Sequence, residues 1–241
     1  MANRHQSLGA DLGDPLPSSV DAAIIASPTD MHYEHAMHYI ERGVPVLIEK
    51  PIAASIWQAR HIVNALQSNQ TIAAVGYVER FNPAWRAARE YFRNADFGLI
   101  ERYGHEVSRD YGNAATDLMS HDIDLLRHLY DGFVEFEVRE SFYNTASMVY
   151  RATHDTGKGS LIANRMVADA PQARRWTAYG EQTVVIDMAD MLVWVGGKRL
   201  EVKPANKIDE MHKDFFGWVR GYSPVNLATA LDGLCALEVT A

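Results

Sequence analysis

Residues 22–76 alternate between short apolar runs and helix-like segments, and few folds accept that pattern. Each run is continuous and four or five residues long, as expected of strands buried on both faces of a parallel sheet. A helix start is readable at Ser27-Pro28-Thr29-Asp30 and a helix stop at Gly43. The resulting order of strand, helix, strand, helix and strand is typical of a doubly wound α/β sheet. The five segments are 22–26, 29–42, 44–48, 56–67 and 72–75.

The pattern changes after Gly76, where we place a domain boundary. Strands dominate from 134 to 202, and glycine-rich turns separate them near Gly157, Gly180 and Gly196. Successive hairpins of this kind predict a large, mostly antiparallel sheet. The sequence therefore predicts an α/β domain over 1–76 and an α+β domain over 77–241. Beyond the hairpins, we expect one more strand over 99–108 and helices over 82–92, 116–130, 207–219 and 224–240.

Charge and composition exclude several classes of function. The formal net charge of −8 gives no support for binding DNA, RNA or an anionic membrane surface. No apolar run approaches the ~20 residues that span a bilayer. Residues 1–13 lack the apolar region of a secretory signal, and Cys235 is the single cysteine, so no intrachain disulfide is possible. These features favour a cytoplasmic protein.

Glu49-Lys50-Pro51 directly follows the apolar run 44–48. Ligands of open parallel sheets bind beyond the carboxyl ends of the strands, so this charged pair is well placed for chemistry. A solvated loop with no function explains the same three residues equally well.

Ser27-Pro28-Thr29 and His32 stand at the corresponding end of the preceding strand. A helix amino terminus offers free N–H groups to a polar or anionic ligand, although ordinary capping explains these residues too. Three histidines, His32, His35 and His38, are spaced by three, and a zinc site is one interpretation of this spacing. We favour surface or half-buried histidines and predict no metal.

Asp117 and His121 form the sharpest candidate pair. Residues four apart share a helix face, and a carboxylate beside an imidazole fixes its tautomer and raises its basicity. Asp124 falls near the same face. The alternative is an aspartate with a capping role next to a histidine that packs in the core.

Taken together and in this order, the motifs resemble those of the glucose-fructose oxidoreductase / inositol dehydrogenase (Gfo/Idh/MocA) family. The resemblance covers nearly the whole chain from about Val20, and the stretch from Arg174 to Asp187 is similar to the family's second domain. The motifs are Ala26-Ser27-Pro28-Thr29 with His32, Glu49-Lys50-Pro51, Gly76-Tyr77 with Arg80-Phe81-Asn82-Pro83, and Asp117 with His121-Asp122-Ile123-Asp124.

The resemblance implies a fold, a cofactor and a set of roles. It implies a Rossmann-like domain that binds NAD or NADP, followed by a domain whose open sheet often mediates oligomerisation, so a homodimer or homotetramer is expected. It places Lys50, Asp117 and His121 in catalysis and, with Arg80, at the substrate. Lys50 also joins the residues that line the nicotinamide side of the cofactor, which are Ser27, Pro28, Thr29, His32 and Glu49.

The implied reaction is hydride transfer between the nicotinamide and a hydroxyl of a sugar, cyclitol or nucleotide sugar. His121 would accept the hydroxyl proton, Asp117 would orient His121, and Lys50 would stabilise charge on the alcohol oxygen. The nicotinamide performs the redox step.

The sequence departs from the family at one point. It lacks the G-x-G-x-x-G fingerprint that binds the pyrophosphate, and only about twenty residues precede the run at 22–26, whereas a βαβ unit needs roughly 30. We therefore expect a fragment of a longer reading frame that lacks the first βαβ unit and binds NAD weakly or not at all.

Two other functions compete with a dehydrogenase. One is a binding or scaffold protein that keeps the fold without catalysis, against which the retained Lys50, Asp117 and His121 argue. The other is a metal-dependent hydrolase that uses the histidines, which we rank last.

Overall fold

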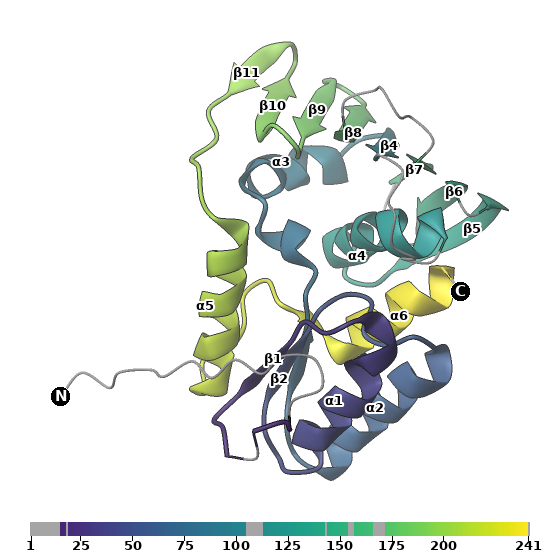
Figure 1. Cartoon of the computed structure of the whole chain (residues 1–241). Coiled ribbons are helices and arrows are strands. Elements are labelled where there is room, and N and C mark those ends of the chain that lie inside the picture. The colour runs from purple at the N-terminus through teal and green to yellow at the C-terminus, as the bar shows by residue number, and fades with distance from the viewer. Residues whose placement is uncertain are drawn as a thin grey trace.

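The computed structural model describes residues 15–17, 19–104, 113–142, 144–153, 157–165 and 172–240. These residues form two sheets, and Figure 1 shows sheet A with its helices below and sheet B above. Helices α4 and α6 lie between the two sheets in this view.

Sheet A has three parallel strands and one short antiparallel strand, in the order β1-β2-β3-β12. The continuous apolar runs explain the parallel part, because all three residues of β2 are buried. Their side chains serve two cores, since Val46 and Ile48 belong to one apolar cluster while Leu47 belongs to another. The strands are β1 (Ala23–Ile25), β2 (Val46–Ile48), β3 (Ala73–Val75) and β12 (Ala228–Thr229).

Helices cover both faces of sheet A. In Figure 1, α1, α2 and α6 lie on one side of the sheet and α5 lies on the other. The α5 side is held by Met211 and Phe215, which pack against Leu47 of β2. These helices are α1 (Thr29–Ile40), α2 (Ile56–Ser68), α5 (Lys207–Val219) and α6 (Ala230–Thr240).

Sheet B has eight strands in the order β11-β10-β9-β8-β4-β7-β6-β5. Its pairs are antiparallel except for β4 with β7. The strands are β4 (Phe97–Tyr103), β5 (Val134–Ser141), β6 (Thr145–Ala152), β7 (Lys158–Asn164), β8 (Ala173–Tyr179), β9 (Val184–Asp187), β10 (Leu192–Val195) and β11 (Lys198–Leu200).

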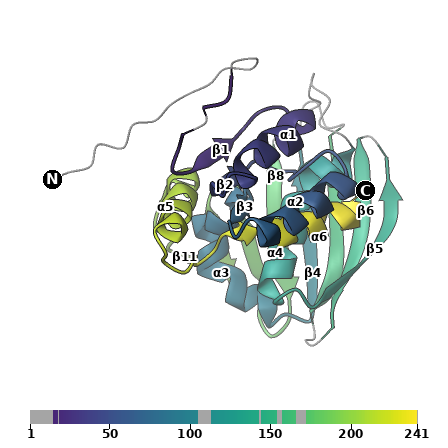
Figure 2. The same ribbon diagram turned by 90° about the horizontal axis from the view of Figure 1, so that it is seen from below.

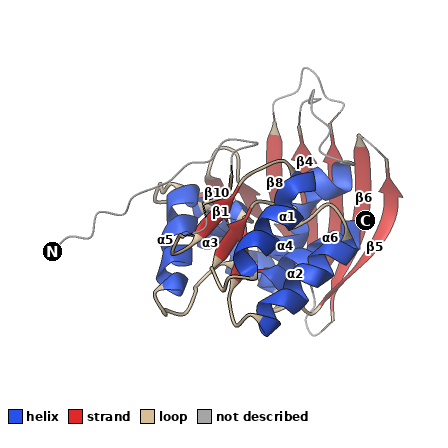
Figure 3. Cartoon of the chain, turned by 60° about the horizontal axis from the view of Figure 1, so that its bottom comes forward, coloured by secondary structure: helices blue, strands red, loops and turns tan. Residues whose placement is uncertain are grey.

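Helices gather on one face of sheet B, as Figures 2 and 3 show. Trp176 of β8 lies between Trp85 and Phe92 of α3, with ring centroids 4.7 and 4.8 Å away. The connecting elements are the 3₁₀ turn η1 (Val78–Phe81), α3 (Pro83–Arg93), the π turn η2 (Ala115–Met119) and α4 (Ser120–Leu129).

The expected fold class is confirmed: a Rossmann-like parallel sheet is followed by a large, mostly antiparallel sheet. The predicted helix over 224–240 was wrong in part, because residues 228–229 form β12 and α6 starts only at Ala230. The expected helix over 116–130 begins as the π turn η2, and residues 105–108 of the expected strand over 99–108 lie outside the described part. The boundary at Gly76 stays a prediction, and the chain returns to sheet A through β12. Within the described residues, no helix is long and apolar enough to cross a membrane.

Candidate functional site

Lys50 follows strand β2 at the carboxyl edge of sheet A and reaches the start of α4. Its Nζ donates to Oδ1 and to the backbone carbonyl oxygen of Asp117, both at 2.8 Å. Both side chains are partly exposed, at 20% and 16%. The Lys50–Pro51 peptide bond is cis. Two motifs 67 residues apart in the sequence therefore meet at one point.

Asp117 is shared by two cations. Its Oδ2 accepts a hydrogen bond from Nη2 of Arg165 at 2.8 Å, while Oδ1 accepts the one from Lys50. Asp117 lies within the π turn η2, and His121 follows in α4. Because a π turn changes the helical register, spacing by four no longer ensures that the two side chains face each other. The role of Asp117 in orienting His121 stays a prediction.

His121 packs edge-on against Tyr77, with ring centroids 5.8 Å apart and planes at 84°. Its Nδ1 is buried and has no hydrogen-bond partner in the described structure. Burial lowers the pKa of His121 well below 6.5, and the nearby charges of Lys50, Arg102, Arg174 and Lys207 lower it further. The ring is therefore neutral at pH 7, the form that can accept a proton.

Glu49 occupies the space that Gly76 leaves open. A Cβ at Gly76 would lie 2.8 Å from Oε2 of Glu49, so a side chain there would displace the carboxylate. The same oxygen accepts the backbone N–H of Lys50 at 3.3 Å. The ends of β2 and β3 thus hold Glu49 beside Lys50.

The predicted cofactor residues Ser27, Pro28, Thr29 and His32 lie at the start of α1. Both ring nitrogens of His32 are 2.8 Å from carbonyl oxygens, those of Ser27 and Pro51, so this ring ties the two loops together. Pro28 is the N-cap and no side chain caps the helix, which leaves N–H groups of the first turn for a polar ligand. With the orphaned Nδ1 of His121, these groups fit the nicotinamide end of the cofactor.

Arg80 is buried in an ion pair. Its Nε and Nη2 donate to both carboxylate oxygens of Asp124 at 2.7 and 2.6 Å, and its Nη1 donates to the Leu227 carbonyl oxygen at 2.9 Å. Only 4% of its side chain is exposed. These contacts give Arg80 a structural task, and its contact with substrate stays a prediction.

The sequence reasoning overlooked a second charged group around Glu79, which is 2% exposed. Arg174 and Lys207 donate to Oε1 of Glu79 at 3.0 and 2.8 Å, and Asn82 donates to Oε2 at 2.8 Å. Burial alone would raise the pKa of Glu79, but Arg102 and Lys207 outweigh it and the pKa is lowered. A signal existed only for Arg174, which stands in the Arg174-Arg175 motif.

Arg165 was overlooked as well. It lies just after β7, in a stretch with no motif, and nothing local marks it as a partner of Asp117. Nε and Nη2 of Arg102 bind the two oxygens of Asp122 at 2.7 Å, next to His121.

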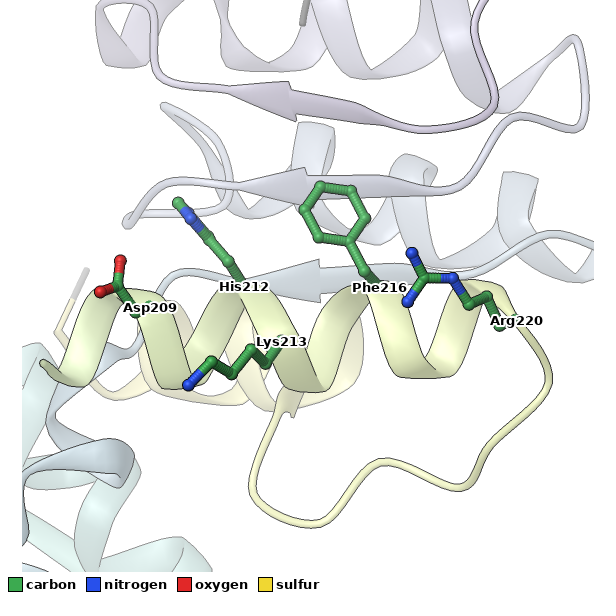
Figure 4. Close-up of a pocket in the computed structure, with 5 residues that line it drawn as sticks. All are labelled: Asp209, His212, Lys213, Phe216 and Arg220. Atoms are coloured by element: carbon green, nitrogen blue, oxygen red, sulfur yellow. The ribbon is translucent and has the colours of Figure 1, made fainter. Parts of the chain in front are cut away.

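A surface hollow lies elsewhere on the molecule. It measures about 460 Å³ and runs along α5, and Figure 4 shows the side chains that line it. It includes none of the candidate catalytic residues, so we assign the site by its chemistry. Within the described residues no group of His, Cys, Asp and Glu could hold a metal ion. The lining residues are Asp209, His212, Lys213, Phe216 and Arg220.

Known proteins resemble this chain in sequence and in fold. Residues 7–77 match the model of GFO_IDH_MocA, an oxidoreductase family with an NAD-binding Rossmann fold. UDP-N-acetylglucosamine 3-dehydrogenase of Acidithiobacillus ferrooxidans is 33% identical over 118 residues, 46% of this chain and 36% of that protein. Inositol 2-dehydrogenase of Klebsiella pneumoniae is 30% identical over 161 residues, 60% of this chain and 47% of that protein.

The chain is similar to oxidoreductases of the Gfo/Idh/MocA family. It spans less than half the length of these two relatives in sequence. The solved structure of the Acidithiobacillus ferrooxidans enzyme has a TM-score of 0.79 and 23% identity, covering 92% of this chain and 77% of its own. A dehydrogenase from Clostridium difficile gives a TM-score of 0.76 at 16% identity, covering 91% and 77%. These two likenesses show the fold of the chain.

Proposed function

We propose that this chain carries the catalytic part of an enzyme that transfers a hydride between NAD or NADP and a hydroxyl group of a sugar, cyclitol or nucleotide sugar. The observation that carries the proposal is the meeting of Lys50 with the segment of Asp117 and His121, at 2.8 Å between Nζ and Oδ1. Relatives named as inositol and UDP-N-acetylglucosamine dehydrogenases support the substrate class.

Lys50 is the group that stabilises charge on the alcohol oxygen. Two of its three N–H donors are directed at Asp117, which leaves one for the substrate. Asp117, itself held by Arg165, keeps the ammonium in place. A fixed positive charge at the reacting oxygen stabilises an alkoxide in the transition state.

His121 is the proton acceptor. Its lowered pKa keeps the ring neutral at pH 7, so it can take the hydroxyl proton as the carbon loses its hydride. In the reverse direction the protonated ring, destabilised by burial and by the surrounding cations, returns the proton readily. The nicotinamide, when bound, supplies the hydride acceptor or donor.

Ser27, Pro28, Thr29, His32 and Glu49 form the proposed contact surface for the nicotinamide half of the cofactor. Support comes from the uncapped first turn of α1 and from the position of Glu49 beside Lys50. The choice between NAD and NADP is left open in this proposal.

The experiment measures hydride transfer by absorbance at 340 nm. It supplies millimolar NAD⁺, NADP⁺ or nicotinamide mononucleotide, which carries only the half that these residues contact. Candidate substrates are myo-inositol, glucose and UDP-N-acetylglucosamine.

Two variants and a control test the roles. Lys50→Met should lower turnover by roughly 100-fold or more, and His121→Asn by about 10²–10⁴-fold. Lys213→Met on the exposed side of α5 should leave turnover unchanged. Variants of Lys50 and His121 that keep full activity would refute the proposed roles.

We also propose a homo-oligomer formed through the face of sheet B that carries no helices (Figures 2 and 3). Phe97 and Tyr179 are cross-strand partners on β4 and β8, with ring centroids 6.4 Å apart. They are 40% and 47% exposed, and Ile162 on β7 is 38% exposed. Apolar patches of this kind favour protein contacts.

A further inference from the structure

We propose that the substrate carries an anionic group, a carboxylate or a phosphate, that binds Arg174 and Lys207 while the reacting hydroxyl lies at Lys50 and His121. This inference rests on the proposed function and names the substrate class of the same site. The charged group around Glu79 carries it.

Arg174 and Lys207 share one carboxylate oxygen. Both donate to Oε1 of Glu79, at 3.0 and 2.8 Å, while Asn82 takes Oε2. One carboxylate thus serves two cations, which leaves one positive charge unbalanced. In the described structure neither cation has a second carboxylate partner.

Both cations keep donors for a ligand. Arg174 uses one of its five N–H donors on Glu79 and Lys207 one of three. Their side chains are 36% and 23% exposed, whereas Glu79 beneath them is 2% exposed. A ligand arriving from solvent would therefore meet the two cations before it meets the carboxylate.

The cluster lies next to the proposed catalytic groups. Tyr77, whose ring contacts His121, stands two residues before Glu79 in the chain. Asp122, which follows His121, is held by Arg102, and Arg102 lies close enough to Glu79 to lower its pKa. Lys207 opens α5, and α5 packs on η1 through Phe81 and Phe215.

The electrostatic surroundings agree with an anionic ligand. The chain has a formal net charge of −8. Even so, four cations act on His121, namely Lys50, Arg102, Arg174 and Lys207, and they pair with only three carboxylates, those of Asp117, Asp122 and Glu79. A locally positive site attracts negatively charged ligands even when the net charge of the protein is negative.

Arginine and lysine also provide the right geometry for such a ligand. A guanidinium presents parallel N–H donors to carboxylate or phosphate, and an ammonium adds a point charge. A neutral polyol has no group that gains comparably from either. Binding energy from a charged group distant from the reacting carbon can also serve to position the hydroxyl.

The test measures binding by calorimetry without cofactor, so it does not depend on hydride transfer. The probes are glucuronate for the carboxylate, glucose 6-phosphate and UDP-glucose for the phosphate, and neutral glucose and myo-inositol. We expect the chain to bind at least one anionic probe and to bind the neutral ones at least 10-fold more weakly. Binding of glucuronate would identify a carboxylate as the recognised group, and binding of glucose 6-phosphate or UDP-glucose would identify a phosphate.

Three variants locate the site. Arg174→Gln and Lys207→Gln should each weaken the anionic probe by about 10–100-fold, the loss of a charge-assisted hydrogen bond. Arg175→Gln is the matched control, because Arg175 neighbours Arg174 but is exposed and pairs with Asp187 on β9. It should change affinity less than 2-fold.

The outcomes separate this inference from the proposed function. Equal binding of neutral and anionic probes, or equal effects of Arg174→Gln and Arg175→Gln, would overturn it. Unfolding curves check that each variant folds, and Lys207→Gln, at the start of a helix, serves if Arg174→Gln does not. Anion binding that depends on Arg174 and Lys207 but comes with no hydride transfer would defeat the proposed function and leave only the anion site standing.

Discussion

Replacing Arg80 with Met tests whether this arginine acts in the structure or at the substrate. The change removes the cation from a buried ion pair and keeps much of the side chain's apolar volume. Asp124, 1% exposed, would then be left without its partner. The neighbouring Asp232 lies 3.4 Å from Nη2 of Arg80 and would offer no compensation, since it carries the same charge as Asp124.

The structure sets the expected magnitude. Removing one partner of a buried, doubly hydrogen-bonded pair costs about 3–5 kcal/mol of the free energy of unfolding. The lost bond to the Leu227 carbonyl oxygen adds about 1 kcal/mol. The double variant Arg80→Met with Asp124→Leu should recover most of the loss, because no buried charge remains.

Unfolding in guanidinium chloride, followed by tryptophan fluorescence, measures these free energies. Arg60→Met is the control, since Arg60 pairs with Glu238 at 2.7 Å but is 63% exposed, and it should cost less than about 1 kcal/mol. If Arg80→Met costs no more than this control, the buried pair does not contribute as argued. Unchanged stability with weaker substrate binding would instead favour the substrate role predicted from the sequence.

Two further outcomes are expected. The pKa of His121 in the folded chain lies below its value of about 6.5 in the unfolded chain. As the pH falls through about 6.5, His121 therefore takes up a proton in the unfolded chain but not in the folded one. The free energy of unfolding should therefore fall as the pH decreases, by up to about 1.4 kcal/mol per pH unit, and it should fall less steeply in His121→Gln. Unfolding curves measured between pH 7.5 and 5 check this, and the same slope in both proteins would contradict it. Sedimentation velocity should give a mass above the 27.0 kDa of one chain. Phe97→Glu should reduce that mass, whereas Tyr222→Glu, at an exposed residue outside sheet B, should not. A monomeric mass for the unmodified chain would refute the oligomer.

The sequence predicted the features that depend on local pattern. The apolar runs of β2 and β3 are buried throughout, as predicted, because both faces of sheet A are covered there. The same prediction was wrong for β1, where Ile24 is 43% exposed. The start of α6 was also readable: Thr229 and Asp232 cap each other's backbone N–H groups at 2.8 and 3.3 Å. This capping signal was overlooked when a helix over 224–240 was expected.

Features that depend on tertiary contacts could not be predicted in the same way. Asp117 and His121 have helical spacing, but the π turn that contains Asp117 is not encoded by any residue pattern we recognise. Glu79 looks like an ordinary polar residue, and its burial depends on Arg174 and Lys207, which lie 95 and 128 residues further along the chain. The candidate site could be named from short motifs, whereas its charge balance required the structure.

Strand β12 completes sheet A with residues from the far end of the chain. Its residues Ala228 and Thr229 pair with Val75 and Ala74, so sheet A draws on segments more than 150 residues apart in the sequence. During synthesis on a ribosome, β1, β2 and β3 emerge long before this last strand does. Until β12 has been translated, the edge of β3 lacks the partner strand that it has in the folded chain.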